Sequence, residues 1–491
     1  MSRINTNVPS LIAQRVLGTQ TRGLNTSLER LSTGFRINRG ADDPAGLIAS
    51  ENLRSEKVAI QAAIGNAQRA EQVVNVAEGG LQEINALLLE VQSLVGQSAN
   101  EAGVSPEEKE ANQLQIDSIL QTIDRVANST SFQGTKLLNG NFDYTTSSVT
   151  ASEISDVNVR AARISDAAGS FLNVTVDVTQ SAQTGQVFLS TGTSLDNGGS
   201  GSITIEVTGS DGVQQFTFAS GSTDDNIVAA INTFKDALGV SASKTGASTA
   251  GSGYVALNST EFGSSQFVRA KVLEGTSDAI ISTDTVGSNS STDIRDTGRD
   301  ATVLINGNQA TTDGLTARVA TDGFDVSLTL AAGSNTAGGS SGFEITGGGA
   351  DFNLAPKVNL ASKVSLGIET VTTGNLGNQD DGFLSALKAG GTANVVNGDL
   401  TKAQQIVDSS IKQVSSLRGR LGAFTKNVVG ATIRNLGVTF ENTSAAESQI
   451  RDTDFANETA ELTRQQIIQQ AATQSLALAN SQPQSVLSLL G

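Results

Sequence analysis

The residues of this chain whose type and spacing could do chemistry are three short acidic segments. They are Asp42-Asp43, Thr283-Asp284-Thr285 and Asp380-Asp381-Gly382. Neighbouring carboxylates can bind a divalent cation, but none of the three has the D-x-D-x-D-G spacing of a calcium-binding loop. Asp43 is followed by Pro44, a residue type favoured in the first turn of a helix. We therefore expect Asp43 to cap a helix and the other two segments to be solvated loops without metal.

Two reactive side chains are missing from the sequence. The 491 residues include no His and no Cys. Without His the chain lacks the usual general base near neutral pH, and without both it lacks the commonest ligands of transition metals. Disulfides and cysteine nucleophiles are excluded as well. We therefore expect a protein that is not an enzyme and that has no cofactor.

The formal net charge of −17 is unevenly distributed along the chain. Residues 141–400 hold 27 acidic against 12 basic side chains, whereas the rest of the chain holds 22 against 20. An acidic surface disfavours binding to nucleic acid, and it also repels copies of itself. The nearly neutral ends are better suited to packing against one another and against other copies, and the acidic middle is expected to face solvent.

Neither a membrane span nor a signal peptide is expected. No segment approaches 18 consecutive apolar residues, which a transmembrane helix would need. The N-terminal segment, MSRINTNVPSLIAQRVLG, has no apolar run followed by a small-residue cleavage site. If the protein is exported, we expect a route other than a cleaved signal peptide.

Apolar residues recur at helical spacing near both ends of the chain. The first stripe comprises Leu17, Thr21, Leu24, Leu28, Leu31 and Phe35. In the longest stripe an apolar residue recurs at every seventh position, at Leu53, Ile60, Ala67, Val74, Leu81, Leu88 and Val95. A third stripe comprises Val414, Leu417, Leu421, Phe424, Val428 and Ala431. The apolar tail adds Leu476, Val486, Leu487, Leu489 and Leu490.

Narrow apolar stripes must be buried against partner helices, and the two ends of one chain can supply those partners to each other. The sequence therefore predicts an α-helical, coiled-coil-like core formed by the N- and C-terminal segments. A heptad stripe is more typical of packing within one chain than of an assembly surface. The apolar tail, residues 454–491, favours assembly because a chain end is usually free to fray.

Local signals place the helices and one hairpin. The longest helix should begin at Pro44 and end near Ala99. A capping box of Ser105 and Glu108 predicts a further helix of about twenty residues. Residues 131–138 have the pattern of a β-hairpin, and Asn139-Gly140 marks a domain boundary. Helical spacing returns from residue 400 to about residue 438.

The middle of the chain predicts β-rich, α+β domains inserted between the helical ends. It is rich in Gly, Ser, Thr and Asp, and residues 201–272 have the pattern of a ββαββ module. Further strands are expected within 302–305, 315–319, 324–330 and 343–345. A disordered linker is the alternative, but alternating strand patterns recur too often for that interpretation.

Several motifs at the two ends resemble those of bacterial flagellins. The N-terminal signature is carried by residues 31–38 (LSTGFRIN) and 41–47 (ADDPAGL). Further landmarks are residues 84–85, 97–100, 123–127 and 132–138. At the C-terminal end the matches are residues 420–423, 448–452, 469–471 and 483–490. The resemblance covers roughly residues 1–140 and 400–491, and residues 201–272 also resemble an insertion module of some flagellins and hook-associated proteins.

The resemblance implies a secreted subunit of the extracellular flagellar filament. Residues 1–40 and 454–491 would be inner-tube segments, disordered in the monomer and folded on polymerisation. Residues 41–140 and 401–453 would be the two halves of the helical core, and residues 141–400 the variable, surface-exposed region. The implied partners are other copies of the chain, the flagellar export apparatus, a secretion chaperone, and hook-associated and cap proteins.

A host innate receptor recognises flagellins, and the resemblance places its epitope at Glu90, Leu94 and Gln115. Receptor-stimulating members carry an Arg where this chain has Glu90 and a Glu where it has Gln115. Reversing the charge at Glu90 should weaken a charge-assisted contact. We therefore expect poor activation of the receptor.

Two functions from different classes remain at this point. The first is a filament protein that polymerises and transmits mechanical force for swimming. The alternative is a hook–filament junction protein of the same superfamily, an adaptor that does not grow into a filament. The matches at both ends, especially in the terminal residues 486–490, favour the filament protein.

Overall fold

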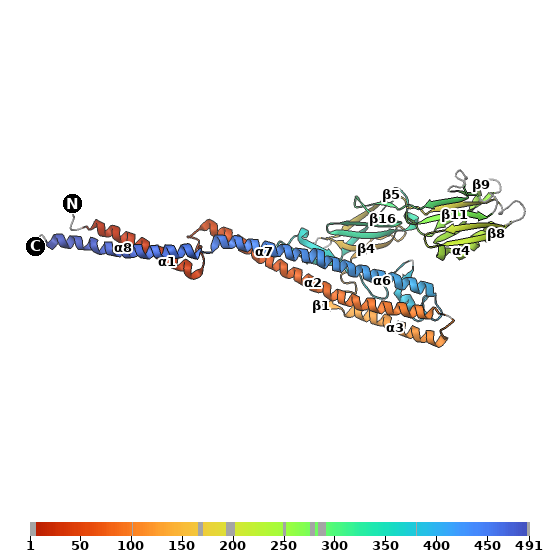
Figure 1. Ribbon diagram of the computed structural model, residues 1–491, viewed down its shortest axis with the longest axis horizontal. Helices are drawn as coiled ribbons and strands as arrows, with labels where there is room; N and C mark the ends of the chain where they lie inside the picture. The colour runs from red at the N-terminus through yellow and green to blue at the C-terminus, as the bar shows by residue number, and fades with distance from the viewer. Residues whose placement is uncertain are drawn as a thin grey trace. The chain divides into compact units, whose positions relative to one another are not determined.

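Helices form both ends of the chain and strands form its middle (Figure 1), which confirms the predicted fold class. This computed structural model describes residues 6–100, 102–164, 170–192, 202–248, 252–274, 280–282, 291–379 and 381–488. The chain divides into two compact units. The first comprises residues 1–71, 353–362 and 423–491, and the second comprises residues 72–352 and 363–422. In the described part of the chain, no helix is long and apolar enough to cross a membrane.

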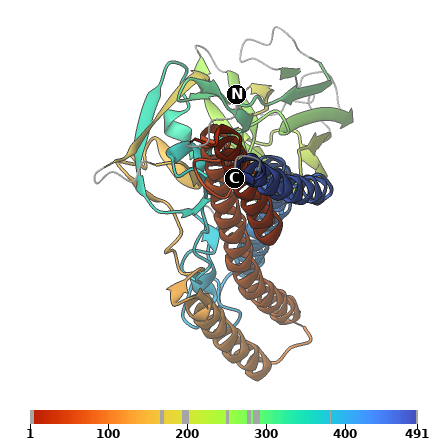
Figure 2. The same ribbon diagram turned by 90° about the vertical axis from the view of Figure 1, so that its left-hand side faces the viewer.

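The first unit is helical. Its elements are α1 (Val8–Thr33), the beginning of α2 (Pro44–Ser98), a π turn named η4 (Phe424–Val429), α7 (Gly430–Arg451), α8 (Phe455–Ser488) and a 3-10 turn, η2 (Leu360–Ser362). The side chain of Asn7 caps α1 by accepting a hydrogen bond from the backbone N–H of Ser10. The helix ends at Gly34, whose φ of 76° lies in the left-handed region that favours glycine. Figures 1 and 2 show α1 and α8 side by side.

The long helix α2 begins where the sequence predicts. The Oδ1 atom of Asp43 accepts a hydrogen bond of 2.8 Å from the backbone N–H of Gly46, as an N-cap does. The helix then continues without interruption to Ser98. Leu53 is half-buried, and the heptad stripe beyond it is buried at Ile60, Ala67, Val74, Leu81, Leu88 and Val95.

Outside its β-rich domains, the second unit contains, besides the rest of α2, two further helices and the hairpin. These are α3 (Pro106–Ser129), α6 (Leu400–Ala423), β1 (Ser131–Phe132) and β2 (Thr135–Lys136). The capping box is formed as predicted, because Ser105 Oγ accepts from the N–H of Glu108 and the Glu108 carboxylate accepts from the N–H of Ser105. The C-terminal helical run ends at Arg451 and not near residue 438.

One β-rich domain of the second unit is built from two antiparallel sheets. Their strand orders are β15-β14-β5-β19-β3 and β16-β17-β18-β4. The core between them includes Val176, Val303, Val326, Leu328 and Ile345. The bounds are β3 Thr145–Ser147, β4 Ile154–Ala162, β5 Leu172–Gln180, β14 Thr302–Ile305, β15 Asn308–Gln309, β16 Thr311–Asp313, β17 Thr316–Thr321, β18 Phe324–Leu330, η1 Ala332–Ser334 and β19 Ser340–Gly347.

A second β-rich domain contains the predicted module and corrects its outline. Its sheets have the orders β12-β6-β10-β9 and β13-β11-β7-β8, so the expected single ββαββ unit is divided between two sheets. The strand Val240–Ser248 was not predicted because Ser, Ala and Gly make up most of it. The bounds are β6 Gln186–Gly192, β7 Ser202–Thr208, β8 Val213–Ala219, α4 Asp224–Thr233, α5 Lys235–Leu238, β9 Val240–Ser248, β10 Ser252–Ser259, β11 Phe267–Glu274, β12 Ile280–Ser282 and β13 Asp293–Thr297.

A segment of short elements leads from the β-rich region back to α6. We call residues 363–399 the strap. Its elements, with the strand that precedes it, are β20 Ala350–Asn353, β21 Lys363–Leu366, β22 Gly377–Asn378, β23 Gly382–Phe383 and η3 Leu384–Leu387. Leu384, Leu387 and Val395 are buried, so the strap is part of the core of the second unit.

Two of the predicted stripes differ from the structure by one residue. In the C-terminal stripe Val428 is only half-buried, and Val429 takes the buried position after Phe424. The π turn η4 causes this difference, because it adds one residue to the helical repeat. In the N-terminal stripe the buried residue is Ser27, whereas the neighbouring Leu28 is 48% exposed.

Candidate assembly surfaces

The contact between α1 and α8 is made through small and polar residues. Ser10 and Ser27 are the buried residues of α1. Ser10 Oγ donates to the side chain of Asn480 at 2.7 Å, and Asn7 Nδ2 donates to the backbone carbonyl of Ala479 at 2.8 Å. Small side chains let the two helices approach closely, and they leave the larger apolar residues at the edges and outside of the pair.

Many of these larger apolar residues are exposed. On α1 they are Val8, Leu11, Ile12, Val16 and Leu28, and on α8 they are Phe455, Ile467 and Leu478. Leu17, Leu24, Leu31 and Leu476 of the predicted stripes are half-buried, and Phe35 is exposed. Apolar residues around the whole circumference are typical of a helix that is buried on several sides. The pair therefore lacks part of its partner surface.

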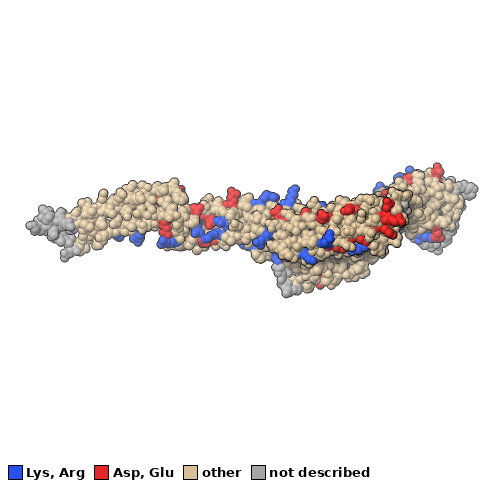
Figure 3. Space-filling model, turned by 90° about the horizontal axis from the view of Figure 1, so that it is seen from below, with Lys and Arg blue, Asp and Glu red and all other residues tan. Residues whose placement is uncertain are grey.

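An apolar groove runs along one side of this helix pair. Its volume is about 590 Å³, and it is lined by Pro9, Ile12, Ala13, Val16, Ile468, Ala471, Ala472, Ser475 and Ala479. The sequence has no charged residue within residues 4–14 and none within residues 465–491. Figure 3 shows the same scarcity of charge on the visible face of α1 and α8. This surface is suited to burial against another apolar surface.

The segment between α1 and α2 meets the junction of α7 and α8. The backbone N–H of Arg36 donates to the carbonyl of Arg451 at 2.7 Å, and the N–H of Thr453 donates to the carbonyl of Gly34 at 2.9 Å. The Arg451 guanidinium lies over the ring of Phe35, 4.7 Å from its centre, and pairs with Glu51 at 3.2 Å. These contacts join the two ends of the chain within the first unit.

The acidic pair Asp42-Asp43 lies in the same region and has structural partners. Asp42 Oδ2 accepts hydrogen bonds from the backbone N–H groups of Arg39 and Asn38. These two bonds are the main reason that the pKa of Asp42 is lowered. In the described residues no group of three or more His, Cys, Asp or Glu side chains could hold a metal ion. Asp284 and Asp380 lie outside the described residues.

In the second unit, α2 and α6 are joined by polar contacts beside their buried stripes. Arg418 Nε donates to Glu78 at 2.9 Å, and Gln92 Nε2 donates to Asp408 at 2.7 Å. Val414, Leu417, Leu421 and Phe424 of the C-terminal stripe are buried, as are Leu81, Leu88 and Val95 of α2. These stripes are filled within the chain, so they are not free to contact another copy.

A row of polar side chains on α3 was missed by the sequence reasoning. Gln113 donates to the carbonyl of Leu387 and accepts from the N–H of Val395. Asp117 accepts from the N–H of Ala389, and Asp124 accepts from the N–H and the hydroxyl of Thr373. The row supplies hydrogen-bond partners to the backbone of the strap, because the short strands of the strap do not satisfy all of these backbone groups. In the sequence, only the helical spacing of Gln113, Asp117 and Asp124 could have indicated this polar row.

The three predicted receptor-epitope positions do not share one exposed surface. Glu90 and Gln115 are exposed on α2 and α3. Leu94 is 6% exposed and belongs to the buried side of α2. In this structure a partner could contact the side chains of Glu90 and Gln115 but not that of Leu94.

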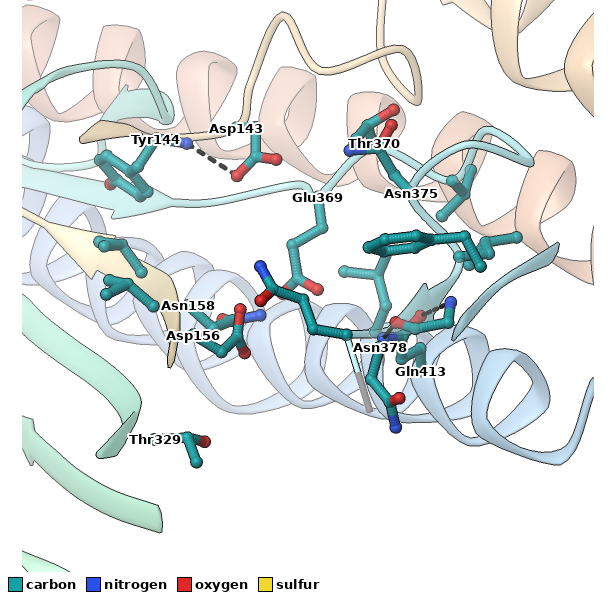
Figure 4. A pocket seen from close by; sticks show the side chains of 18 of the residues that line it. Asp143, Tyr144, Asp156, Asn158, Thr329, Glu369, Thr370, Asn375, Asn378 and Gln413 are labelled. Carbon is teal, nitrogen blue, oxygen red and sulfur yellow. Dashed lines mark hydrogen bonds between the residues drawn. The ribbon is translucent and has the colours of Figure 1, made fainter. Parts of the chain in front are cut away.

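A polar cleft of about 500 Å³ lies beside the strap (Figure 4). Asp143, Asp156 and Glu369 line it, and Gln413 binds both backbone groups of Gly377 at its edge. Burial and the nearby Glu369 raise the pKa of Asp143. Arg420 neutralises Glu369 with an ion pair of 2.8 Å.

The last predicted assembly residues lie at the C-terminal end of the chain. Leu489 and Leu490 lie outside the described residues. Val486 and Leu487 belong to α8, but the structure describes nothing of their side chains.

Comparisons with known proteins bear on both ends and on the whole length. Residues 4–143 match the model for the bacterial flagellin N-terminal helical region, and residues 404–490 match that for the C-terminal helical region. The chain is 30% identical to Flagellin D of Vibrio cholerae and 26% identical to Flagellin A of Helicobacter pylori, covering 99% of both chains in each case. A solved structure of FliC from Burkholderia pseudomallei is 16% identical, with a TM-score of 0.24 over 73% of this chain and 99% of that chain.

Proposed function

The chain belongs to the bacterial flagellin family and is a structural subunit of the flagellar filament, not an enzyme, and we propose that its copies pack together through α1 and α8. The observation that carries this proposal is the exposed apolar surface of these two helices. Val8, Leu11 and Ile12 on α1 and Ile467 and Leu478 on α8 are all exposed in the single chain. These side chains are 50–67% exposed, so burying the rest of each one between copies would contribute roughly 1–2 kcal/mol.

The charge distribution supports the same arrangement. Residues 4–14 and 465–491 carry no charged side chain, whereas the region between residues 141 and 400 carries most of the net −17. Copies can approach closely through neutral helices, but acidic domains repel each other at short range. We therefore assign the helical ends to the inside of the filament and the β-rich domains to its solvent-facing outside.

The segments 1–40 and 454–491 are proposed to be loosely held in the free subunit and fixed on polymerisation. In the single chain α1 and α8 pack through few buried side chains, among them Ser10, Ser27 and Ala472. Helices with so little burial open readily. Limited proteolysis tests this point: cleavage should occur within both segments in the monomer and be suppressed in the filament. Ends that stay intact in the monomer under the same protease would contradict it.

The further partners are proposed on the same basis. The family forms the extracellular flagellar filament, so this chain should leave the cell, and we assign its route to the flagellar export apparatus. An exposed apolar helix such as α8 needs cover before assembly, which a secretion chaperone would provide. Cap and hook-associated proteins would then contact the subunit at the growing and basal ends of the filament.

Weak activation of the host innate receptor is also proposed. Glu90 is exposed, so its charge is available to repel a partner that accommodates Arg. Replacing Glu90 by Arg should lower the concentration for half-maximal signalling about tenfold or more, since a charge-assisted hydrogen bond contributes roughly 1.5–3 kcal/mol. Glu83→Arg, another exposed position of α2, is the matched control. A strong response to the natural chain at low nanomolar concentration would refute the proposal.

Electron microscopy of the purified protein with filament seeds tests the main proposal. Long filaments growing from the seeds are the expected result. Short additions that stop after a few copies would instead favour the junction adaptor. Failure to add to the seeds under any salt condition would overturn both.

A further inference from the structure

The C-terminal helical run changes its hydrogen-bond pattern for one turn. Between α6 and α7, residues Phe424–Val429 form the π turn η4, and the backbone N–H of Gly430 donates to the carbonyl of Thr425, five residues earlier. π turns are rare, occur mostly as single turns inside α-helices, and are frequent at functional sites. The division of the chain into its two compact units falls between Gly422 and Ala423, directly before this turn.

The burial pattern shows that the turn holds one additional residue. Val414 and Leu421 are buried seven residues apart, and so are Val429 and Leu436. Between Leu421 and Val429 the interval is eight. The stripe of α2 keeps intervals of seven throughout, from Ile60 to Val95. An inserted residue in a heptad pattern has to be absorbed by local rewinding, and here the rewinding is confined to a single turn.

The helix beyond the turn carries apolar residues on two faces. The present register buries Val429 and Leu436. An uninterrupted α-helix would instead place Val428, Ala431 and Val438 on the buried side. In the structure Val428 is half-buried, Ala431 is exposed and Val438 is 58% exposed. Asn435 and Asn442 share the second face with these three residues, so α7 has a second face that is apolar in part and can also be buried.

Three glycines near the turn have no packing reason in the single chain, whereas a Cβ atom at Gly430, directly after the turn, would lie 3.3 Å from the carbonyl oxygen of Thr425. A Cβ atom added at Gly419, Gly422 or Gly437 would meet no atom within 4 Å. None of these positions therefore needs glycine to allow close approach within the subunit. Glycine lowers the stability of a helix interior, so its repetition around η4 keeps this part of the run easy to rewind.

We propose that η4 is a conformational joint of the filament subunit. Converting the π turn to an α turn shifts the register of the helix beyond it by one residue, a rotation of about 100° with an axial shift of about 1.5 Å. The joint lets α7 exchange the face that carries Val429 and Leu436 for the face that carries Val428 and Val438 when neighbouring copies pack against it. The inference rests on the filament function and adds to it a place in the chain where the subunit adapts to its neighbours.

Deleting Val428 tests the joint. The deletion removes the additional residue and leaves Val429 and Leu436 in the buried stripe of a continuous α-helix. We expect the monomer to keep or raise its thermal midpoint and the seeded elongation rate to fall at least tenfold, because the joint is locked. Elongation at the parent rate, with a folded variant, would overturn the proposal.

Glycine substitutions give a second test that does not depend on the deletion variant folding. Gly422→Ala and Gly437→Ala stiffen the run beside η4, and Gly65→Ala stiffens α2 at a position that also has open space around it. We expect slower elongation for the first two variants and the parent rate for the third. Equal rates for all three would overturn the joint. Failure of the parent chain itself to elongate would instead contradict the filament function.

Discussion

The stripe of α2 and the pair formed by α1 and α8 contain similar apolar residues, but the two regions differ in how far the chain buries them. From Ile60 to Val95 the α2 stripe is buried within the chain, whereas Leu11, Ile12 and Leu478 on the terminal helices are exposed. The first region is a finished core, by which we mean that a single chain buries it completely. The second is an unfinished core, and we propose that other copies supply its missing partners. Heptad spacing alone does not distinguish these two situations, because it records that a face will be buried but not by which chain.

The largest expected effect lies in the finished core. Leu88 is fully buried on α2, so Leu88→Ala should lower the free energy of unfolding of the monomer by about 2–5 kcal/mol. The next residue, Leu89, is 49% exposed and gives a matched control. Leu89→Ala should change the free energy of unfolding by less than about 0.5 kcal/mol. Urea denaturation of both monomers measures the contrast, and equal losses would show that the α2 stripe is not the core of the free subunit.

A smaller loss is expected where α3 holds the strap. Gln113 is buried and forms hydrogen bonds of 2.8 Å to the carbonyl of Leu387 and 2.9 Å to the N–H of Val395. Gln113→Ala leaves both backbone groups without these partners, at a cost of roughly 1–3 kcal/mol. The control is Gln115→Ala, an exposed glutamine on the same helix. If the two variants unfold at the same urea concentration, the polar row does not contribute to the finished core.

In the unfinished region the effect should appear in assembly and not in the monomer. Ile12 is 50% exposed and lines the apolar groove. Ile12→Asp would bury a charge between copies, so the seeded elongation rate should fall at least tenfold, about 1.4 kcal/mol, with an unchanged urea midpoint. Gln14→Asp places the same charge at an exposed polar position of α1 and should retain more of the parent rate. A monomer destabilised as strongly as by Leu88→Ala would remove the distinction between the two regions.

Sequence reasoning succeeded where local chemistry determines structure. Asp43, Ser105 and Glu108 identified two helix starts, because capping depends on residues within one turn. It failed by one residue at Val428, since the π turn depends on how the whole helix is buried. It also missed Gln113, Asp117 and Asp124, whose partners lie more than two hundred residues away in the strap. Such pairings exist only after the chain has folded back on itself.

The smallest effects concern two carboxyl groups, one in each compact unit, that should respond to pH with opposite signs. Burial and Glu369 raise the pKa of Asp143 in the second unit. Its ionised form is therefore disfavoured by folding, and this penalty grows as the pH rises from the ordinary carboxyl range through the raised pKa. Asp143→Asn should be slightly more stable than the parent at pH 7, and the gain should vanish once the pH falls below the ordinary range.

Asp42, near the terminal helices, has a pKa lowered by the backbone N–H groups of Arg39 and Asn38. Its stabilising contribution is present above the ordinary carboxyl range and is lost as the pH falls through the lowered pKa. Asp42→Asn should therefore be less stable than the parent at pH 7 and approach it in acid. Urea midpoints of both variants between pH 7 and pH 3 measure the two trends. If the two differences from the parent have the same sign at pH 7, burial at Asp143 and backbone hydrogen bonds at Asp42 do not shift the two pKa values in opposite directions.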